Sequence, residues 1–389
     1  MPFCLKKCDY CSFYSKSLNS SCKENQSLQY DYKPIADYLE ILLMEIEYYQ
    51  SLYQIVPKTI YLGGGTPSLL SINDLERIIK KFDLSGISEI TIEINPATVN
   101  ISQLQKYKEI GINRLSIGVQ SLIDKELSLM GRLHKVADIV SLYENGLDKV
   151  FFNISIDYIY GLPNQKLSDV EYSIKKIIEL RPSHISIYCL SLEEGVPLSK
   201  LSSEIPSDDV VSQMYFHIIN VLNNHDYIQY ELSSFYKKTL DKEKVQDFVS
   251  IHNIAYWSGE QYLGFGACAC GYVASVGSPF MVPSKELSDK KIIRYINHSI
   301  TNYKQNDYIK EKLFLTETDI ETEFIITGLR KTKGINISDF NKRFNVSMLD
   351  KYNNTIKKLS DQGMVTIDQN IKINKDYYFV SNEVLCKFV

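Results

Sequence analysis

The stretch MPFCLKKCDYC, residues 1–11, holds three of the eight cysteines of the chain, at Cys4, Cys8 and Cys11. At this cysteine frequency, a C-x3-C-x2-C pattern arises by chance in roughly one such chain in 300. Thiolates favour soft metals, and the chain lacks the paired CxxC hooks of a typical zinc site. An iron–sulfur cube needs four ligands, so three cysteines leave one iron open to another molecule. The pattern therefore predicts an iron–sulfur cluster on this loop.

The composition is that of a globular protein. Its 389 residues are 44% apolar and 23% charged, and 43 Lys and Arg against 47 Asp and Glu give a net charge of −4. Nucleic-acid binders normally carry a basic excess, so we expect no nucleic-acid partner. No apolar run approaches the ~20 residues that span a bilayer, no signal-peptide core is present, and nothing supports peripheral membrane contact. The uneven cysteine spacing argues against a secreted disulfide framework, so we expect a cytoplasmic protein.

Strands and helices alternate between Pro57 and Leu190. Short β-branched runs predict strands over Thr59–Leu62, Glu89–Ile94, Arg114–Val119, Val150–Tyr158 and His184–Leu190. Apolar residues at helical spacing predict helices over Ile72–Lys81, Ser102–Glu109, Val136–Asn145 and Leu167–Leu180. Upstream, one face of a further helix is formed by Leu39, Leu42, Leu43 and Ile46. This alternation is typical of a parallel sheet covered by helices, either open or curled into a barrel.

Glycine and polar residues lie at the ends of four of these strands. Gly63–Gly65 and Thr66 follow the first strand, and Glu93 lies near the end of the second. Gln120 follows the third, and Asp157 lies late in the fourth. Each of these residues is compatible with ordinary turn chemistry. Because ligands bind at the carboxyl ends of parallel strands, four such ends beside a thiolate loop predict a ligand site.

The regular alternation of strands and helices ends at about residue 203. We expect a helix over Asp208–Asn223 and a strand over Tyr227–Leu232. The C-terminal part predicts three helices followed by a hairpin, over Thr316–Lys331, Ile337–Phe344, Met348–Gln362, Met364–Ile367 and Ile371–Ile373. Three helices and a terminal hairpin are typical of a winged-helix-like domain. We therefore predict a core over 1–203, an α+β extension over 204–310 and a winged-helix-like domain over 311–389.

The motif Cys4-x3-Cys8-x-Tyr10-Cys11 resembles the signature of the radical SAM superfamily. The resemblance implies an α/β fold, a partial (β/α)6 barrel, whose three cysteines hold a [4Fe–4S] cluster. S-adenosylmethionine (SAM) chelates the open iron in that superfamily, and reduction of the cluster releases a 5′-deoxyadenosyl radical. By the same resemblance, the SAM contacts are Tyr10, Gly64, Gly65, Thr66, Glu93, Gln120, Arg132, Asp157 and Ser191.

Within this superfamily the chain is similar to the oxygen-independent coproporphyrinogen III oxidase branch, through the stretches GGGTPS, EINP, RLSIGVQS, MGRLH, ISIDYIYGLPNQ and ISIYCLSLEEGVPL. That branch contains coproporphyrinogen dehydrogenases and the HemW heme chaperones. The dehydrogenases usually carry a fourth cysteine two residues after the third, where this chain has Phe13. HemW proteins carry an HNxxYW stretch, matched by His252–Trp257, and a glycine-rich run, matched by Gly264–Gly271. The greater resemblance is therefore to HemW.

The resemblance to HemW implies a protein that binds heme and passes it to an acceptor protein, with a [4Fe–4S] cluster and SAM as cofactors. His252 is the candidate heme ligand, because neutral imidazole is the commonest ligand of heme iron. The competing interpretation is a packed histidine that orders a loop. The family usually reads GAGAH where this chain ends its run in Cys270. Cys268 and Cys270 could supply a thiolate to iron, but we expect them to be small buried residues in a tight segment.

Two other functions are weighed against the chaperone. One is an oxygen-independent coproporphyrinogen III dehydrogenase, in which the adenosyl radical abstracts hydrogen from propionate side chains that then lose CO2. The other is a winged-helix regulator with a redox cluster, which the acidic net charge disfavours. One departure affects the fold, because relatives have a strand of the type YIHIPFC before the cluster loop. This sequence opens at Met1, so either its start was assigned late or the first barrel strand is missing; in the second case we expect the cluster loop to lose its anchor and the SAM site to be weakened.

Overall fold

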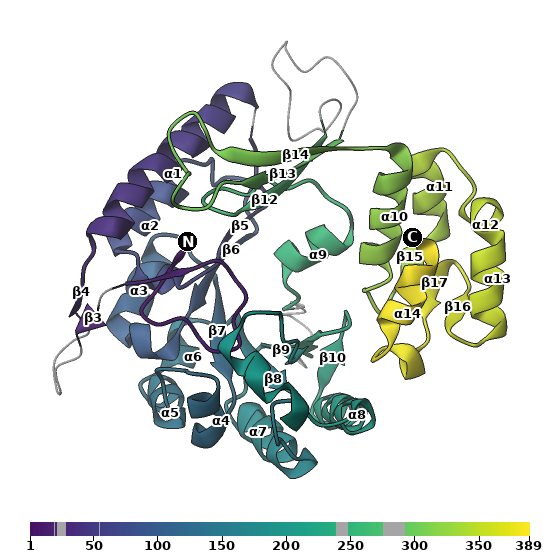
Figure 1. Cartoon of the computed structure of the whole chain (residues 1–389), viewed down its shortest axis with the longest axis horizontal. Helices are drawn as coiled ribbons and strands as arrows, with labels where there is room; N and C mark the ends of the chain where they lie inside the picture. The colour runs from purple at the N-terminus through teal and green to yellow at the C-terminus, as the bar shows by residue number, and fades with distance from the viewer. Residues whose placement is uncertain (19, 22–28, 54, 239–247, 275–291) are drawn as a thin grey trace.

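The computed structural model describes residues 1–18, 20–21, 29–53, 55–238, 248–274 and 292–389 (Figure 1). Its main feature is a seven-stranded sheet with the strand order β10-β11-β9-β8-β7-β6-β5. The parallel part consists of β5 (Thr59–Leu62), β6 (Glu89–Ile94), β7 (Arg114–Gln120), β8 (Ile154–Tyr160) and β9 (His184–Cys189). Two antiparallel strands, β11 (Ser234–Lys237) and β10 (Tyr227–Gln229), continue the sheet beyond β9.

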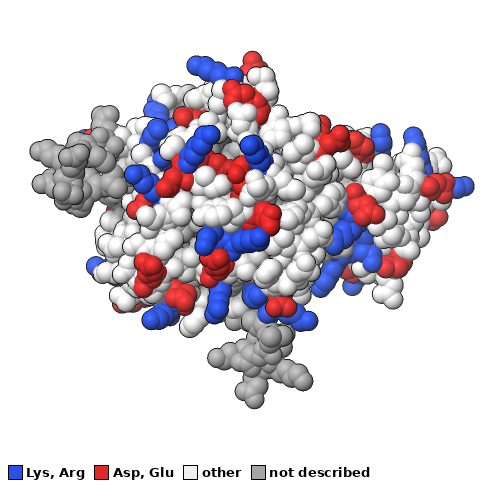
Figure 2. All heavy atoms as spheres, turned by 90° about the horizontal axis from the view of Figure 1, so that it is seen from below, with Lys and Arg blue, Asp and Glu red and all other residues white. Residues whose placement is uncertain are grey.

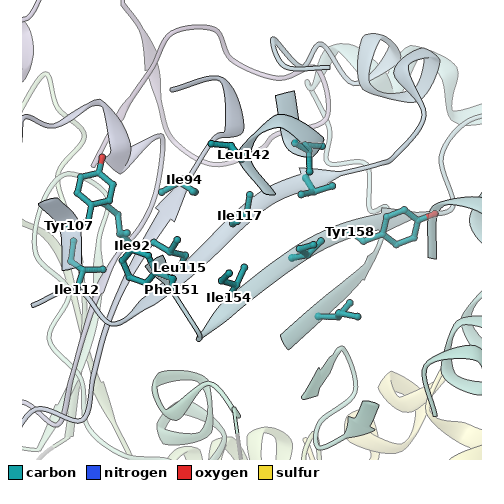
Figure 3. Packing of buried hydrophobic residues seen from close by; sticks show 14 of the residues in the cluster. Ile92, Ile94, Tyr107, Ile112, Leu115, Ile117, Leu142, Phe151, Ile154 and Tyr158 are labelled. Atoms are coloured by element: carbon teal, nitrogen blue, oxygen red, sulfur yellow. The ribbon is translucent and has the colours of Figure 1, made fainter. Parts of the chain in front are cut away.

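Helices cover the outer side of this curved sheet (Figure 1). They are α1 (Lys33–Leu52), α2 (Ile72–Ile79), α3 (Ile101–Glu109), α4 (Asp124–Leu129), α5 (Val136–Glu144), α6 (Leu147–Val150), α7 (Leu167–Glu179) and α8 (Asp208–Asn224). The strands are apolar nearly throughout, so Ile92, Leu115 and Ile154 pack in one buried cluster with helical residues (Figure 3). The predicted parallel sheet covered by helices is confirmed.

Most predicted elements are found with limits shifted by a few residues, and three of them differ in ways that have a structural reason or involve a break. β8 begins at Ile154 and not at Val150, because Gly146, at a left-handed φ of 94°, starts the short helix α6. β10 ends at Gln229, three residues before the predicted end. The helix predicted over Met348–Gln362 is broken at Tyr352 into α12 (Met348–Lys351) and α13 (Asn353–Asp361). The apolar pattern does not distinguish these cases, since it continues across each break.

The extension places a second, antiparallel sheet beside α1 (Figure 1). It contains β12 (Cys270–Ala274), β13 (Ile292–Asn297) and β14 (Ile309–Leu315). The short helix α9 (Ile251–Trp257) carries the HNIAYW stretch and lies between the main sheet and the C-terminal part. The sequence alone had not shown that this stretch is helical.

The C-terminal part has a separate hydrophobic core, in which Ile325, Phe340 and Ile371 are fully buried. It consists of α10 (Glu317–Gly328), α11 (Ile337–Phe344), α12, α13, α14 (Ser381–Leu385) and the sheet β15-β17-β16, formed by Ile335–Asn336, Asn370–Ile373 and Val365–Ile367. The expected hairpin is β16 and β17, and β15 adds a strand to it. The domain limits at 203 and 310 stay predictions.

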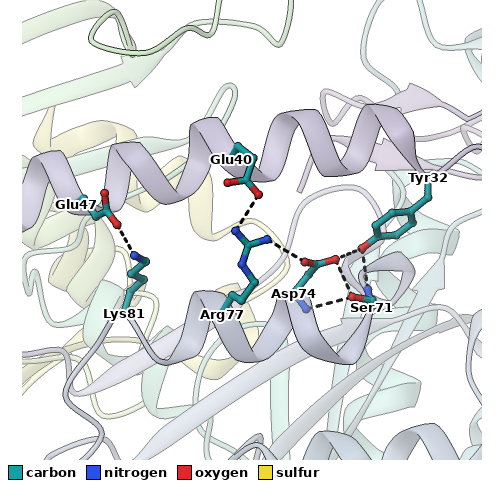
Figure 4. A network of polar contacts seen from close by, with 7 residues as sticks. All are labelled: Tyr32, Glu40, Glu47, Ser71, Asp74, Arg77 and Lys81. Carbon is teal, nitrogen blue, oxygen red and sulfur yellow. Dashed lines mark hydrogen bonds and ion pairs between the residues drawn. The ribbon is translucent and has the colours of Figure 1, made fainter.

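A polar network joins α1 to α2 beside the loop that follows β5 (Figure 4). Ser71 caps α2, with its Oγ accepting the Asp74 N–H at 3.1 Å. The Asp74 carboxylate accepts the Tyr32 hydroxyl at 2.6 Å and lies 3.3 Å from Arg77. Burial opposes the charge of Asp74, but the hydrogen bonds from Tyr32, Ser71 and Arg77 outweigh it and lower the pKa. The network thus fixes α2 at the end of the segment that follows β5.

Replacing Asp74 by alanine is expected to lower the free energy of unfolding by about 2–3 kcal/mol, because the Tyr32 hydroxyl and the Ser71 side chain lose a buried charged acceptor. Glu40 pairs with Arg77 at 2.8 Å but is exposed, so the Glu40→Ala control should cost at most about 1 kcal/mol. Urea unfolding of both variants measures the difference. Equal losses of unfolding free energy in the two variants would contradict the role of Asp74 as the buried acceptor of this network.

The surface carries both signs of charge. Figure 2 shows Lys and Arg interspersed with Asp and Glu over the face drawn there. Of the helices in the described ranges, none is long and apolar enough to cross a membrane. The expected lack of nucleic-acid and membrane partners stays a prediction.

Candidate functional site

The cysteine loop is held over the carboxyl end of β5 by main-chain hydrogen bonds. The short strand β1 (Phe3–Cys4) pairs with β2 (Lys16–Ser17) in a separate sheet, so β5 stays at the edge of the main sheet among the described strands. Gly65 N–H donates to Met1 O at 2.6 Å, and Thr66 N–H donates to Phe3 O at 2.8 Å. These contacts anchor the loop without a preceding barrel strand.

The glycines after β5 let this loop approach. A Cβ on Gly65 would lie 2.5 Å from Phe3 O, which is closer than atoms can pack. Gly64 has a φ of 112°, and a Cβ there would lie 2.8 Å from Met1 O. Glycine is required at Gly64 by both the left-handed backbone and the close contact, and at Gly65 by the close contact alone. The close approach of the cysteine loop is therefore by itself a reason for glycine at these positions, whether or not a ligand also binds beside them.

The three thiols are half-buried and lie near one another. Cys4 Sγ is 3.5 Å from Thr66 Oγ1, and Cys8 Sγ is 3.6 Å from Arg132 Nη1. Burial raises the pKa of Cys11, and the Cys8 and Cys4 thiolates raise it further. No three His, Cys, Asp or Glu side chains of the described residues surround a single metal ion. In an iron–sulfur cube each cysteine ligates a different iron, so this spread of thiols fits a cluster.

Arg132 lies between the cysteine loop and the end of β7. Its Nη2 donates to Gly118 O at 2.6 Å, and its side chain also hydrogen-bonds Tyr10. Its Nε is buried and has no hydrogen-bond partner within the described residues. A buried unpaired donor is costly, and a guanidinium matches the planar fork of a carboxylate. The side chain therefore fits the carboxylate of a bound amino acid such as the methionyl part of SAM.

Two half-buried carboxylates face the same end of the sheet. Glu93 accepts the Gly64 N–H at 3.1 Å and the Tyr61 hydroxyl at 3.0 Å, and burial raises the pKa of Glu93 to about 7. Asp157 accepts the Ser116 hydroxyl at 2.8 Å, and burial raises the pKa of Asp157 to about 6. The two carboxylates also repel each other. A cation placed here would favour their charged forms, so the pair fits an amino or sulfonium group.

Gln120 and Ser191 complete the predicted set. Gln120 has a φ of 66°, at an irregularity in the pairing of β7 with β8, and a Cβ on Gly118 would lie 3.0 Å from its Nε2. Gln120 therefore lies beside Arg132 and Gly118. Ser191 follows β9 at the same edge of the sheet and is exposed. The structure thus gathers the predicted SAM residues at one edge, and their roles stay predictions.

His252 lies deeper in the molecule, against the start of β5. Its Nδ1 is 2.8 Å from Thr59 Oγ1, and its ring stacks on Tyr61 with 4.8 Å between centroids. Glu89 accepts the main-chain N–H groups of Ile251 and His252 at 2.9 and 3.2 Å, which fixes the start of α9. Burial lowers the pKa of His252 to about 4, and the Arg114 charge lowers it further. The imidazole is therefore neutral at pH 7, as a metal ligand must be.

Two residues that connect the site were not identified from the sequence. Tyr61 hydrogen-bonds Glu93 through its hydroxyl and stacks on His252 through its ring, so it joins the two halves of the site. Glu89 holds the helix that carries His252. One signal was available for Tyr61, because Thr59 and Tyr61 share a face of β5 by strand alternation. No local signal links Glu89 to a helix more than 160 residues away.

A cavity of about 720 Å³ is lined by Glu93, Tyr61 and His252 together. It runs along β5, and its wall includes Gly64, Tyr61, Glu93, His252 and Phe13. The opposite wall is the glycine-rich segment Gly259–Cys270, together with apolar side chains of α1. Cavities of ~300–1,000 Å³ with apolar walls and a few polar groups are typical of cofactor sites. The volume and lining fit a large, flat, largely apolar ligand.

Cys268 and Cys270 are more exposed than predicted. Both line the cavity, Cys268 is half-buried, and Cys270 is exposed. The prediction that they are small buried residues is wrong. Cys268 has a φ of 57°, which turns the chain before β12 begins at Cys270. The turn exposes thiols that a regular strand pattern would have placed in the core.

Glu45 of α1 holds the glycine-rich segment from behind. Its carboxylate accepts Gly266 N–H and Asn297 Nδ2, each at 2.6 Å, and also the Tyr303 hydroxyl. Burial raises the pKa of Glu45 to about 7, although these hydrogen bonds oppose the rise. The wall of the cavity is therefore attached to α1 through this buried acid and through Tyr38, whose hydroxyl accepts the Ala267 N–H at 3.2 Å.

The stability that Glu45 contributes is expected to depend on pH. An acid whose pKa rises from 4.5 to about 7 on folding contributes fully below pH 4.5, and this contribution is lost as the pH rises through 7. The advantage of the wild type over Glu45→Gln should thus fall by about 2–3 kcal/mol between pH 5 and pH 8. Urea unfolding across this range measures it, with Glu93 and Asp157 unchanged in both proteins. A difference independent of pH would contradict the expectation.

Comparisons with known proteins agree with this geometry. Residues 1–177 match the radical SAM superfamily, and residues 315–371 match the HemN C-terminal domain. The chain is 30% identical to "Heme chaperone HemW" of Bacillus subtilis, over 100% of this chain and 97% of that protein. It is 31% identical to the protein of the same name from Lactococcus lactis, over 100% and 96%.

Among solved structures, coproporphyrinogen III oxidase (HemN) from Escherichia coli has the same fold. The TM-score is 0.78 at 20% identity, over 100% of this chain and 88% of that chain. This likeness confirms the predicted partial barrel with a C-terminal domain. Together with the full-length sequence similarity, it shows that the chain belongs to the HemW family of the radical SAM superfamily.

Proposed function

We propose that the chain is a heme chaperone, which binds heme in the cavity beside β5 and transfers it to an acceptor protein. The observation that carries the proposal is the position of His252. Its neutral imidazole lines a cavity of about 720 Å³ that is largely apolar, in a chain similar over its whole length to proteins named heme chaperones. Its Nδ1 is engaged by Thr59, so Nε2 is the nitrogen available to iron.

The cluster and SAM are the second part of the proposal. Cys4, Cys8 and Cys11 would ligate a [4Fe–4S] cluster, with Arg132 donating to the Cys8 sulfur. When bound, the cluster and SAM supply one-electron chemistry. The residues of this chain bind and orient SAM: Glu93 and Asp157 face its positive groups, and Arg132 Nε meets its carboxylate. Tyr10, Gly64, Gly65, Thr66, Gln120 and Ser191 would complete the binding site.

Tyr61 gives this arrangement a physical link. A ligand that alters Glu93 acts on the Tyr61 hydroxyl, and the Tyr61 ring stacks on His252. Occupation of the SAM site would thus bear on the heme site through a single side chain. We place the protein in the cytoplasm, with heme and a heme-accepting protein as its partners.

A transfer assay tests the chaperone function. The protein is loaded with one equivalent of ferric heme, separated from free heme, and mixed with apomyoglobin as a generic acceptor. The proposal predicts a heme complex that survives gel filtration and then loses its heme to apomyoglobin, seen as a change in the Soret band. A protein that retains no heme, or one that never releases it to the acceptor, would overturn the proposal.

A further inference from the structure

Two thiols lie in the wall of the cavity that faces His252. Cys268 and Cys270 both line it, and both are free cysteines. Cys270 is exposed, so its sulfur is accessible to a ligand in the cavity, while Cys268 is half-buried. They are distinct from the thiols of the cluster loop, because Cys4, Cys8 and Cys11 are not among the described residues that line this cavity.

Aromatic rings connect Cys270 to His252. The His252 and Tyr256 rings pack edge to face with 5.0 Å between centroids, and the Tyr256 and Tyr262 rings are 4.4 Å apart. Burial raises the pKa of Tyr256, and the neighbouring Tyr262 and a thiolate at Cys270 raise it further. Cys270 and Tyr256 line the same cavity, and the Tyr256 ring contacts His252. One planar ligand can reach the imidazole and the thiol from the same cavity.

The segment that carries the two thiols is held firmly. Cys268 N–H donates to His298 O at 2.9 Å, and Asn297 N–H donates to Ala269 O at 2.9 Å. Behind it, Gly266 N–H is bound to the Glu45 carboxylate at 2.6 Å. A ligand position that is fixed in this way loses little conformational entropy when it binds. Burial raises the pKa of Cys268, and the nearby Lys310 charge opposes this rise only in part.

We propose that Cys270 supplies a thiolate ligand to the iron of heme bound in this cavity, with Cys268 as its neighbour. The inference rests on the proposed function, because it concerns the same heme. Thiolate is an established axial ligand of heme iron. The Cys270 thiol releases its proton to solvent, and a sulfur lone pair forms the bond to ferric iron. No electron is transferred, and water leaves the iron if it holds that position.

Spectroscopy of the heme complex tests the assignment without any activity assay. Wild type, Cys270→Ser, Cys268→Ser and Cys189→Ser are loaded with ferric heme, and the bound heme is examined by electron paramagnetic resonance and, after reduction, as the carbonyl complex. Cys189 is exposed and does not line the cavity, so it is the matched control. We expect the red-shifted carbonyl Soret band of thiolate-bound heme in the wild type and in both Cys268→Ser and Cys189→Ser. Cys270→Ser should lose it and bind heme about tenfold more weakly.

The outcomes separate the two proposals. If the wild type holds no heme, the proposed function fails and the ligand assignment fails with it. If the wild type holds heme and Cys270→Ser gives the same spectra and affinity, only the assignment of Cys270 is overturned. Loss of the thiolate signal in Cys268→Ser and not in Cys270→Ser would assign the ligand to Cys268 and equally overturn it. Circular dichroism of each variant shows that the fold is retained.

Discussion

Replacing Cys4, Cys8 and Cys11 together by alanine is expected to abolish the iron–sulfur cluster. After anaerobic reconstitution with iron and sulfide, the wild type should contain about four irons per chain and the variant close to none, since an iron–sulfur cube cannot be held without its thiolates. Iron and sulfide analysis, with the visible absorption spectrum, measures the loss.

The matched control removes cysteines that lie elsewhere. Cys189 and Cys386 are both exposed and are far in sequence from the loop, so Cys189→Ala and Cys386→Ala should keep the full iron content. Retention of a cluster by the triple variant would contradict the assignment of the loop. Equal loss in the control variants would do so as well.

Replacing His252 by alanine is expected to weaken heme binding at least about tenfold, which corresponds to about 1.4 kcal/mol. The variant loses an iron ligand and also the ring that stacks on Tyr61. Heme titration followed by absorbance gives the dissociation constant. His225 is exposed at the end of α8, and its side chain hydrogen-bonds Val221 O, so His225→Ala is the control and should bind heme as the wild type does.

A second variant separates ligation from packing at this position. His252→Gln keeps a polar side chain near Thr59 but offers iron no imidazole. We expect it to bind heme as weakly as His252→Ala while the protein keeps its wild-type unfolding temperature. An unchanged heme affinity in both variants would show that His252 is a packed histidine that orders α9.

Much of the fold follows from local patterns. The runs Thr59–Leu62 and Glu89–Ile94 are strands with the predicted limits. A buried parallel strand is a nearly continuous run of apolar, β-branched residues, so it can be identified from its own sequence. The ends of elements were less predictable. Tyr352 breaks a continuous helical pattern, and Gly146 starts a helix where apolar residues suggested a strand. These breaks depend on backbone conformation, which the apolar pattern does not encode.

The residues of the candidate site also fall into a predictable and an unpredictable group. Residues at strand ends, such as Glu93 and Asp157, could be predicted because a parallel sheet brings its carboxyl ends together. Contacts between distant segments could not. Tyr61 meets His252 across 191 positions, and the exposed Cys270 follows a turn with left-handed residues at Gly266 and Cys268. No spacing rule connects such residues before the chain is folded.

One experiment tests the chaperone function against its enzymatic alternative most directly. Protein reconstituted anaerobically with iron and sulfide is titrated with heme, while a parallel sample receives SAM, a reductant and coproporphyrinogen III. The account predicts a stable complex with one heme per chain and no decarboxylated porphyrinogen. Formation of protoporphyrinogen IX without a stable heme complex would contradict the account and identify the chain as a coproporphyrinogen III dehydrogenase.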